Sequence, residues 1–544
     1  MRHILIISAA LCAASIVACD DEPSTPPMMN TSGEAAGAQA GETAGDVAGE
    51  MAGELAGEAA GEQAGEQAGE VAGEQAGEAA GEQAGEQAGE MAGEMAGEMG
   101  DAFANVSCDD FDPEVCVEIP SGDTLALQEA ANSVLDDSVI VMGSGVFSLD
   151  NAVTLRGANN LTLIGQGKDV TTLDFSGVSV QTNGVDIISD GIRVEGFTII
   201  DSPKDGLRIE DSDGVTIRSI KVSWSVGPTP ESGAYGIYPV KVSRVLLEDS
   251  EAYNASDAGI YVGQCVHAIV RRNIAKANVA GIEIENTQFA DVYDNLAEDN
   301  SAGLLVFDLP GNPVLGRDVD IHDNQIINNN RANFAPGGVV QSVPSGVGTF
   351  ALASRRVAIH NNVYTDNGTF DVAFVNGLAI EGDEEKWKLD PAELVGDNEG
   401  LNVTEREGFI YNYASSDLWV YGNEHSGSGQ MPDPGNLETR PLSLLLKLTY
   451  GDTPIDAILY DTIGESAFSA TDAMGNSNDA HMCVQAEGAT FASLDLETLA
   501  ARFDVFDIPT PDDLYRPEAP FAPFDCEGFT GGAIIGPMMG VGDQ

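Results

Sequence analysis

One short phrase repeats along the middle of the chain and constrains its fold more than any other feature. A glycine is followed by an apolar residue, any residue and a second apolar residue, in copies that begin at Gly206, Gly236, Gly259, Gly281 and Gly303, the last three spaced 22 residues apart. Each repeat accommodates two strands of period 2, each ended by a turn residue. It is too short for two helices and lacks a leucine-rich consensus. The sequence therefore predicts an all-β solenoid whose repeat is one coil of a parallel β-helix.

A second series of polar residues accompanies the glycines. Each member follows a short apolar strand, and the series comprises Ser250, Asn273, Asn295, Asn324, Asn362 and Asn423. Asparagine tolerates the left-handed turn conformation, and its amide can stack on the amide of the next coil. We therefore expect an asparagine ladder at one corner of the solenoid. The apolar partners, such as Ile260, Ile282, Ile284 and Leu304, are expected to fill the bore.

The N-terminus has the features of an exported lipoprotein. Residues 1–18 combine a short basic start with an apolar stretch that is too short to span a membrane, as in a signal peptide. Ile16-Val17-Ala18-Cys19 has the form of a lipobox, which predicts a lipidated Cys19. The alternative is ordinary cleavage beside an incidental cysteine. The predicted location is the bacterial cell envelope, lipid-anchored on the periplasmic side or at the outer-membrane surface.

Residues 19–103 are predicted to be a disordered acidic tether. From Gly33 to Met99 the chain repeats a four-residue unit, mostly Ala-Gly-Glu-X. One glycine per helical turn disfavours a helix, like charges at i and i+4 repel, and few bulky apolar residues are available to form a core. The repeat is expected to hold the folded body away from the membrane.

The charge balance narrows the range of partners. The chain has a net charge of −64, and residues 102–544 alone hold 68 acidic and 23 basic residues, a net charge of −45. This excludes nucleic acid as a general partner. A polyuronate would be repelled unless Ca²⁺ bridged it to the protein or a local basic cleft overrode the field.

The body divides into a β-helix over residues 104–426 and a C-terminal cap over residues 427–544. An amphipathic helix over Thr124–Leu135 is expected to cover the first coil, and further helices are expected over Leu442–Leu448 and Leu494–Phe503. The period is broken by predicted loops at Gly227–Tyr235, Asp308–Arg317 and Asn328–Thr349 and by an insertion at Glu381–Ala414.

Seven cysteines are present, and five remain if Cys12 leaves with the signal peptide and Cys19 is lipidated. In an oxidising compartment Cys108 and Cys116 are expected to pair, and Cys483 and Cys526 are candidates for a second disulfide. Cys265 ends a strand and is expected to be a buried free thiol.

A candidate site follows from the direction of the side chains. Residues two and four after each repeat glycine should point away from the bore, and the three predicted loops should flank this strand face as the walls of a groove. Tyr238 and Tyr261 are candidates for stacking on sugar rings, and Glu283, Glu285 and Asp308 for binding Ca²⁺ or for acid–base chemistry. The alternative is that outward residues are simply polar and solvated.

Other residues offer less specific chemistry. Asp320-Ile321-His322-Asp323 resembles the Asp-Pro-His-Asp motif of alginate epimerases, with isoleucine in place of proline, and His360 takes the same place one coil later. The favoured interpretation is that these are exposed strand residues without a catalytic role. A lyase of this fold would need an arginine or lysine base, for which Lys204 and Arg208 are nearest to the predicted groove.

The phrases "YGIYPV", "SDAGIYVGQ", "AGIEIEN", "LLVFDLPG" and "NFAPGG" are similar to those of an uncharacterised family of exported bacterial parallel β-helix repeat proteins. The resemblance runs from about Leu125 to the C-terminus and is most specific over Tyr235–Gly338. It implies a right-handed β-helix of the pectin-lyase type and a gene neighbourhood with a dihaem c-type cytochrome family.

Three functions remain open at this point. The first is a carbohydrate-binding module, or a polysaccharide lyase or epimerase that modifies the glycan. The second is a non-catalytic partner of a periplasmic c-type cytochrome, which the resemblance implies. The third is a structural surface protein. Ca²⁺ is the one cofactor that the candidate residues suggest.

Overall fold

A computed structural model describes residues 105–461, 482–485, 488–494, 507–516 and a few single residues up to 524. The predicted signal peptide, Cys19 and the predicted acidic tether all lie outside the described residues. Within the described part, no helix is both long and apolar enough to cross a membrane.

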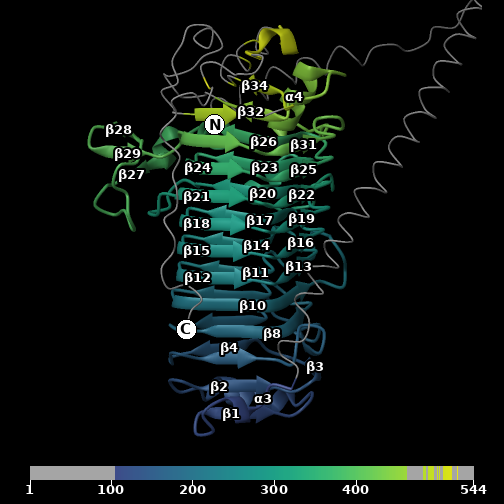
Figure 1. Cartoon of the computed structure of the whole chain (residues 1–544), viewed down its shortest axis with the longest axis vertical. Coiled ribbons are helices and arrows are strands. Elements are labelled where there is room, and N and C mark those ends of the chain that lie inside the picture. Colours follow the sequence, from purple (N-terminus) through teal and green to yellow (C-terminus); the bar gives the residue numbers. More distant parts are fainter. Residues whose placement is uncertain are drawn as a thin grey trace, which may run out of the picture. The chain divides into compact units, whose positions relative to one another are not determined.

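The body is a parallel β-helix whose coils stack strand upon strand (Figure 1). Each regular coil contributes one strand to each of three faces, and all pairings within the faces are parallel, as in β14–β17 and β17–β20. The sequence-based prediction of an all-β solenoid is confirmed. β8 (Arg193–Ile200) and β10 (Asp213–Ser223) are long enough to belong to both face 1 and face 2.

The remaining strands of face 1 are β1 (Cys116–Ile119), β2 (Val139–Met142), β5 (Thr162–Ile164), β12 (Ser243–Glu248), β15 (Val266–Arg271), β18 (Gln288–Tyr293), β21 (Arg317–His322), β24 (Arg355–His360), β30 (Ser416–Tyr421) and β33 (Met482–Gln485). Face 2 adds β3 (Gly145–Ser148), β6 (Thr171–Asp174), β13 (Glu251–Tyr253), β16 (Ile274–Lys276), β19 (Leu296–Glu298), β22 (Gln325–Ile327), β25 (Val363–Thr365) and β31 (Glu424–Ser426). Face 3 holds β4 (Val153–Arg156), β7 (Val185–Ile188), β9 (Leu207–Glu210), β11 (Ile237–Val240), β14 (Ala258–Gly263), β17 (Ala280–Glu285), β20 (Ala302–Phe307), β23 (Val347–Leu352), β26 (Phe370–Val375), β32 (Ile458–Tyr460) and β34 (Phe491–Ser493).

The bore is filled by apolar side chains in register. Ile260, Ile282 and Leu304 are paired across three successive strands of face 3, and all three are fully buried in one core cluster. Ile284 belongs to the same cluster. The predicted strand register is therefore confirmed. Because like residues stack on like from coil to coil, each coil buries its neighbour's apolar surface as well as its own.

The predicted asparagine ladder lies at the corner between faces 1 and 2. The Nδ2 group of Asn273 donates to Oδ1 of Asn295 at 3.0 Å, and Nδ2 of Asn295 donates to Oδ1 of Asn324 at 2.9 Å. The residue in the left-handed conformation is not the ladder asparagine, as we expected, but the one before it, with φ of 53° at both Arg272 and Asp294. This residue turns the chain, and the asparagine then points inward to bond the neighbouring coils.

A second ladder, which the sequence analysis missed, lies at the corner between faces 2 and 3. It consists of Asn278, Asn300, Asn329 and Asn367, linked amide to amide at 3.0–3.1 Å. Both ladders are buried, so the hydrogen bonds within them replace the hydrogen bonds to water that the amides lose on folding.

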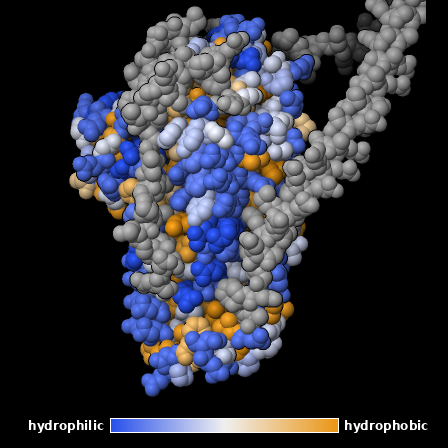
Figure 2. All heavy atoms as spheres, viewed as in Figure 1, coloured by the Kyte–Doolittle hydropathy of each residue, from blue (hydrophilic) through white to orange (hydrophobic). Residues whose placement is uncertain are grey.

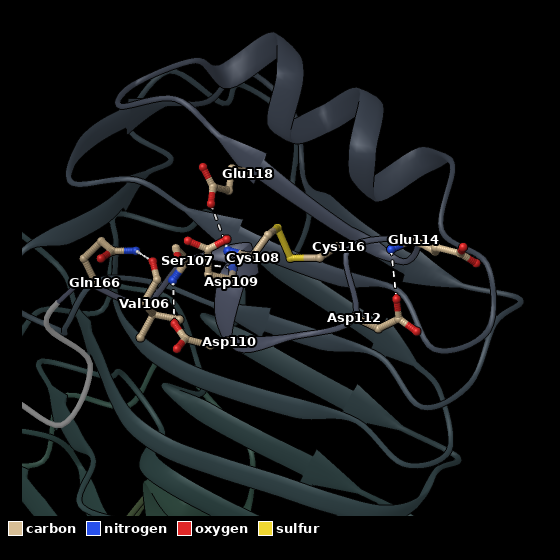
Figure 3. The surroundings of a disulfide bond; sticks show 10 residues. All are labelled: Val106, Ser107, Cys108, Asp109, Asp110, Asp112, Glu114, Cys116, Glu118 and Gln166. Carbon is tan, nitrogen blue, oxygen red and sulfur yellow. Dashed lines mark hydrogen bonds between the residues drawn. A yellow bond between two sulfur atoms is a disulfide. The ribbon is translucent and has the colours of Figure 1, made fainter.

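The N-terminal end is closed by α3 (Thr124–Asn132), which matches the predicted capping helix but ends three residues earlier. The Cys108–Cys116 disulfide, correctly predicted, ties η2 (Cys108–Asp110) to the start of β1 (Figure 3). Apolar patches are visible at this end of the body (Figure 2). Its exposed large apolar residues are Val117, Leu125, Leu135, Val146, Val170 and Val180.

The other cysteines agree with expectation as far as they are described. Cys265 is a buried free thiol. Cys483 is disulfide-bonded, and its predicted partner Cys526 lies outside the described residues.

Strands β32, β33 and β34 continue the parallel ladders past residue 426, so the repeat extends into the region we assigned to the C-terminal cap. The predicted Leu442–Leu448 helix is present in this region as α4 (Pro441–Tyr450). The predicted insertion forms a small antiparallel sheet of β27 (Lys388–Leu389), β28 (Thr404–Arg406) and β29 (Phe409–Tyr411). Short 3-10 turns complete the described structure: η3 (Val339–Ser342), η4 (Gly377–Ala379), η5 (Glu384–Trp387) and η6 (Pro511–Asp513).

Candidate functional site

The outward side of face 3 is where the structure departs most from the sequence-based prediction. Tyr261, Glu283, Glu285 and Asp308 point away from the bore as expected, but they are only 4%, 4%, 9% and 2% exposed. The prediction that they line an open groove is therefore wrong.

They are buried because the loops that break the repeat fold over this face instead of standing beside it. Ala335, Val340 and Val343 of the predicted Asn328–Thr349 loop share a buried apolar cluster with Tyr261 and Leu305.

Three tyrosine rings gather at the edge of this covered region. Tyr235, Tyr238 and Tyr261 form a triangle whose ring centroids are 4.6, 4.7 and 4.9 Å apart. Tyr235 and Tyr238 are half-buried, whereas Tyr261 lies deeper. Tyr235 belongs to the end of the Gly227–Tyr235 loop, and Tyr238 and Tyr261 lie on neighbouring strands β11 and β14. The triangle therefore offers partly exposed ring surface.

Carboxyl groups lie beside the rings. Asp257 is within hydrogen-bonding reach of Tyr235, and Glu285 is within reach of Tyr261. Glu283 is the neighbour of Tyr261 on β17, and its Oε2 atom is buried without a hydrogen-bond partner among the described residues. We refer to the following six residues as the tyrosine–carboxyl cluster: Tyr235, Tyr238, Tyr261, Asp257, Glu283 and Glu285.

Burial shifts the carboxyl groups of the cluster toward their neutral form. It raises the pKa of Asp257 to about 7, against the opposing hydrogen bond from Tyr235, and nearby Glu285 raises this pKa further. Burial likewise raises the pKa of Glu285 to about 7, against the hydrogen bond from Tyr261. For Glu283, burial and then the charges of Asp257 and Glu285 hold the pKa well above its usual range. Such shifts by desolvation and like charge are common at functional sites.

Asp308 has a different role from the one predicted. Its Oδ2 atom is 2.7 Å from Nη1 of the fully buried Arg355, and its carboxylate accepts the Gly316 N–H at 3.0 Å. Burial raises its pKa to about 6 even though Arg355 opposes the shift. Asp308 therefore closes the 308–317 loop on itself and is already occupied by protein donors.

The metal hypothesis gains no support from this geometry. No group of three or more histidine, cysteine or acidic side chains is arranged to hold a metal ion in the part of the chain that is described. The predicted Ca²⁺ set of Glu283, Glu285 and Asp308 is not such a group, because Asp308 is engaged by Arg355.

The two basic residues proposed for a lyase are also engaged. Lys204 lies 3.2 Å from Asp205, and Arg208 pairs with Glu210 and lies 3.6 Å from Asp186.

His322 and His360 belong to face 1, on a different side of the coil. Tyr293, His322, His360 and Tyr421 stack ring on ring along successive strands, with centroids 5.0, 5.0 and 4.5 Å apart. The stack thus presents ring edges, not ring faces, to its surroundings.

The charge state of His322 does not suit a general base. Its ring nitrogens lie 3.0 Å from Asp291 and 2.7 Å from Asp323. Burial works against the charged imidazolium, but these two hydrogen bonds outweigh it and raise the pKa of His322 to about 9. The ring is therefore protonated near neutral pH and cannot accept a further proton.

Tyr235 and Asp257 were missed by the sequence analysis. Both lie within the phrases that define the repeat, one residue before Gly236 and two residues before Gly259. An inspection of the residue that precedes each repeat glycine could have identified Tyr235 as a candidate. Nothing in the spacing shows that the Asn328–Thr349 loop folds over the face.

Comparison with known proteins agrees with the fold. Residues 151–319 match the family model described as "Right handed beta helix region". A search among curated proteins finds no match.

Solved structures with a similar trace include two A-modules of Azotobacter vinelandii mannuronan C-5 epimerases. The AlgE6 module is 15% identical, with a TM-score of 0.36, and the alignment covers 67% of this chain and 92% of that one. The AlgE4 module is 13% identical, with a TM-score of 0.34 and the same coverage. The catalytic unit of a Streptomyces thermodiastaticus GH87 α-1,3-glucanase is 16% identical, with a TM-score of 0.34 over 50% of this chain and 57% of that one.

Proposed function

We propose that this protein is a lipid-anchored, extracytoplasmic β-helix module that binds a glycan at the tyrosine–carboxyl cluster. The observation that carries the proposal is Oε2 of Glu283, a buried acceptor that has no hydrogen-bond donor among the described residues and lies on the strand beside Tyr261. An unsatisfied buried acceptor costs about 1–3 kcal/mol, which a ligand donor would recover. Sugar hydroxyls supply such donors, and the half-buried rings of Tyr235 and Tyr238 supply apolar surface for a sugar ring.

The position of the cluster suits a binding role. Strands β11, β14 and β17 hold Tyr238, Tyr261, Glu283 and Glu285, and residues of the 227–235 and 328–349 loops pack in the same apolar cluster as the tyrosines. Sites held on rigid strands and edged by loops are common in glycan recognition and in other ligand binding.

The direct test is a glycan array probed with the full chain, followed by calorimetry on any glycan that binds. Tyr238→Ala removes a ring at the rim and is expected to weaken binding by about tenfold or more, as loss of one stacking contact would. The paired change His322→Ala with His360→Ala on face 1 is the matched control and should leave binding intact. If the histidine changes abolish binding and Tyr238→Ala does not, the site lies on face 1.

The anchoring part of the proposal has its own test. Cys19→Ser should shift the protein from the membrane fraction to the soluble fraction and remove incorporated radiolabelled fatty acid. Unchanged membrane association of the variant would refute lipid attachment at Cys19.

A further inference from the structure

Resting on the proposed glycan-binding function, we infer that the ligand carries a positive charge: the tyrosine–carboxyl cluster is built to receive the primary ammonium group of a de-N-acetylated amino sugar.

The first argument is an imbalance of charge. Asp257, Glu283 and Glu285 interact with one another electrostatically, and Asp205 adds to the field at Asp257. The cations that approach from the packed elements are already bound to other carboxylates: Lys204 to Asp205, Arg208 to Glu210 and Asp186, and Arg355 to Asp308. Among the described ion pairs, none neutralises Asp257, Glu283 or Glu285.

The second argument is the unfilled hydrogen-bonding capacity of Glu283. Its side chain is more than nine-tenths buried, and its Oε2 atom has no partner within the described residues. If every oxygen of an acidic cluster already had a hydrogen-bond donor, protonation of the carboxyl groups alone would make the cluster stable. Here an acceptor without a partner among the described residues belongs to the cluster itself, and an ammonium group offers three donors together with the charge.

The third argument is the set of rings. Tyr235, Tyr238 and Tyr261 pack against one another, with pairwise interplanar angles of 36°, 51° and 84°. Three rings set at such angles present faces and edges in several directions. A cation held near aromatic faces and carboxylates is the arrangement by which proteins recognise ammonium groups. Tyr238 already has one such contact, with the Arg208 guanidinium 5.9 Å from its ring centroid.

These arguments favour an amino sugar over other glycans. A uronate would bring a negative charge to three uncompensated carboxyl groups and is disfavoured. An N-acetylated sugar has no charge to offer. A glucosamine-type unit presents both the hydroxyl donors that the proposed function requires and the ammonium that the charge imbalance requires.

The decisive experiment compares matched oligosaccharides on the full chain by calorimetry near neutral pH. Oligomers of glucosamine, N-acetylglucosamine and galacturonate are titrated, with spermidine as a cation that is not a sugar. The expected result is binding of the glucosamine oligomer about tenfold or more tighter than its acetylated form. Glu283→Gln should remove this preference, while the control Glu424→Gln, an exposed carboxylate on β31, should keep it.

Binding should also release protons, since an ammonium favours the ionised carboxylates; the measured enthalpy will then change with the ionisation enthalpy of the buffer. Equal or tighter binding of the acetylated oligomer overturns the ammonium inference but leaves glycan binding standing. Tightest binding of galacturonate also overturns it. Spermidine binding as tightly as the glucosamine oligomer, with no neutral sugar binding, overturns both, as does the absence of any binding.

Discussion

Replacing Asn295 with alanine tests whether the buried amides hold successive coils together. Nδ2 of Asn295 donates to the Val270 carbonyl and to Oδ1 of Asn324, both at 2.9 Å. Oδ1 of Asn295 accepts from the backbone N–H and from Nδ2 of Asn273, both at 3.0 Å. The substitution therefore removes four hydrogen bonds from a site that is 1% exposed.

The magnitude follows from these contacts. At about 1 kcal/mol net for each hydrogen bond, the loss is about 4 kcal/mol, and the orphaned Asn273 amide can only add to it. We therefore expect Asn295→Ala to lower the free energy of unfolding by about 3–5 kcal/mol. The same substitution at Asn423, the last ladder member, removes only three such hydrogen bonds and should lower the free energy of unfolding by less.

The assay is urea-induced equilibrium unfolding followed by circular dichroism. Native-state hydrogen exchange at the Asn273 amide would show whether the defect is local, because a solenoid need not unfold in one step. Asn402→Ala is the matched control, since Asn402 is exposed, and it should change stability by no more than about 0.5 kcal/mol. A loss below about 1 kcal/mol for Asn295→Ala, or equal effects at both sites, would refute the reasoning.

Three further predictions concern the bore, the carboxyl groups and the tether. Ile282→Asp should abolish soluble expression because it buries an unpaired charge in the bore, whereas Ile282→Val should cost only about 0.5–1.5 kcal/mol; similar expression of both variants would show that the register is wrong. The pKa values of Asp257 and Glu285 are both raised to about 7, so the folded state binds more protons than the unfolded state once the pH exceeds the ordinary pKa values of these groups. The stability that they contribute is therefore lost as the pH rises through about 7. Thermal melts should show this decline and Glu283→Gln should flatten it, whereas an increase in stability over this range would contradict it. A chain that starts at Ala102 should melt at the same temperature as one that starts at Asp20, as expected if residues 19–103 form a tether that contributes nothing to the core; a drop of many degrees would show that the repeat packs on the body.

The sequence was sufficient to predict the coils because their periodicity is local. Gly281-Ile282-Glu283-Ile284 alternates with period 2, and the 22-residue spacing then fixes which residues stack. The same regularity identified the Asn273–Asn423 ladder, although it did not show that the left-handed residue is the one before each asparagine.

The site was harder to predict because its environment is made by residues outside the repeat. Whether Glu283 is exposed depends on where Ala335, Val340 and Val343 pack, and no spacing encodes that. The role of Asp308 likewise depends on Arg355, which lies 47 residues away in the chain. Non-periodic loops and long-range ion pairs are set by tertiary packing, and a single sequence carries little information about either.

The corner between faces 1 and 2 has a consequence for how a protein of this kind can change. It consists of two residues in every regular coil, as at Arg272-Asn273, Asp294-Asn295 and Asp323-Asn324. Within the described residues, the long excursions at 227–235, 308–316, 328–346, 377–415 and 427–457 enter at the corners on either side of face 3. One edge of the coil therefore acts as a fixed spine, while the other two accept new segments without disturbing its amide contacts. New binding properties are accordingly expected to arise by exchange of loops around face 3, with the spine left unchanged.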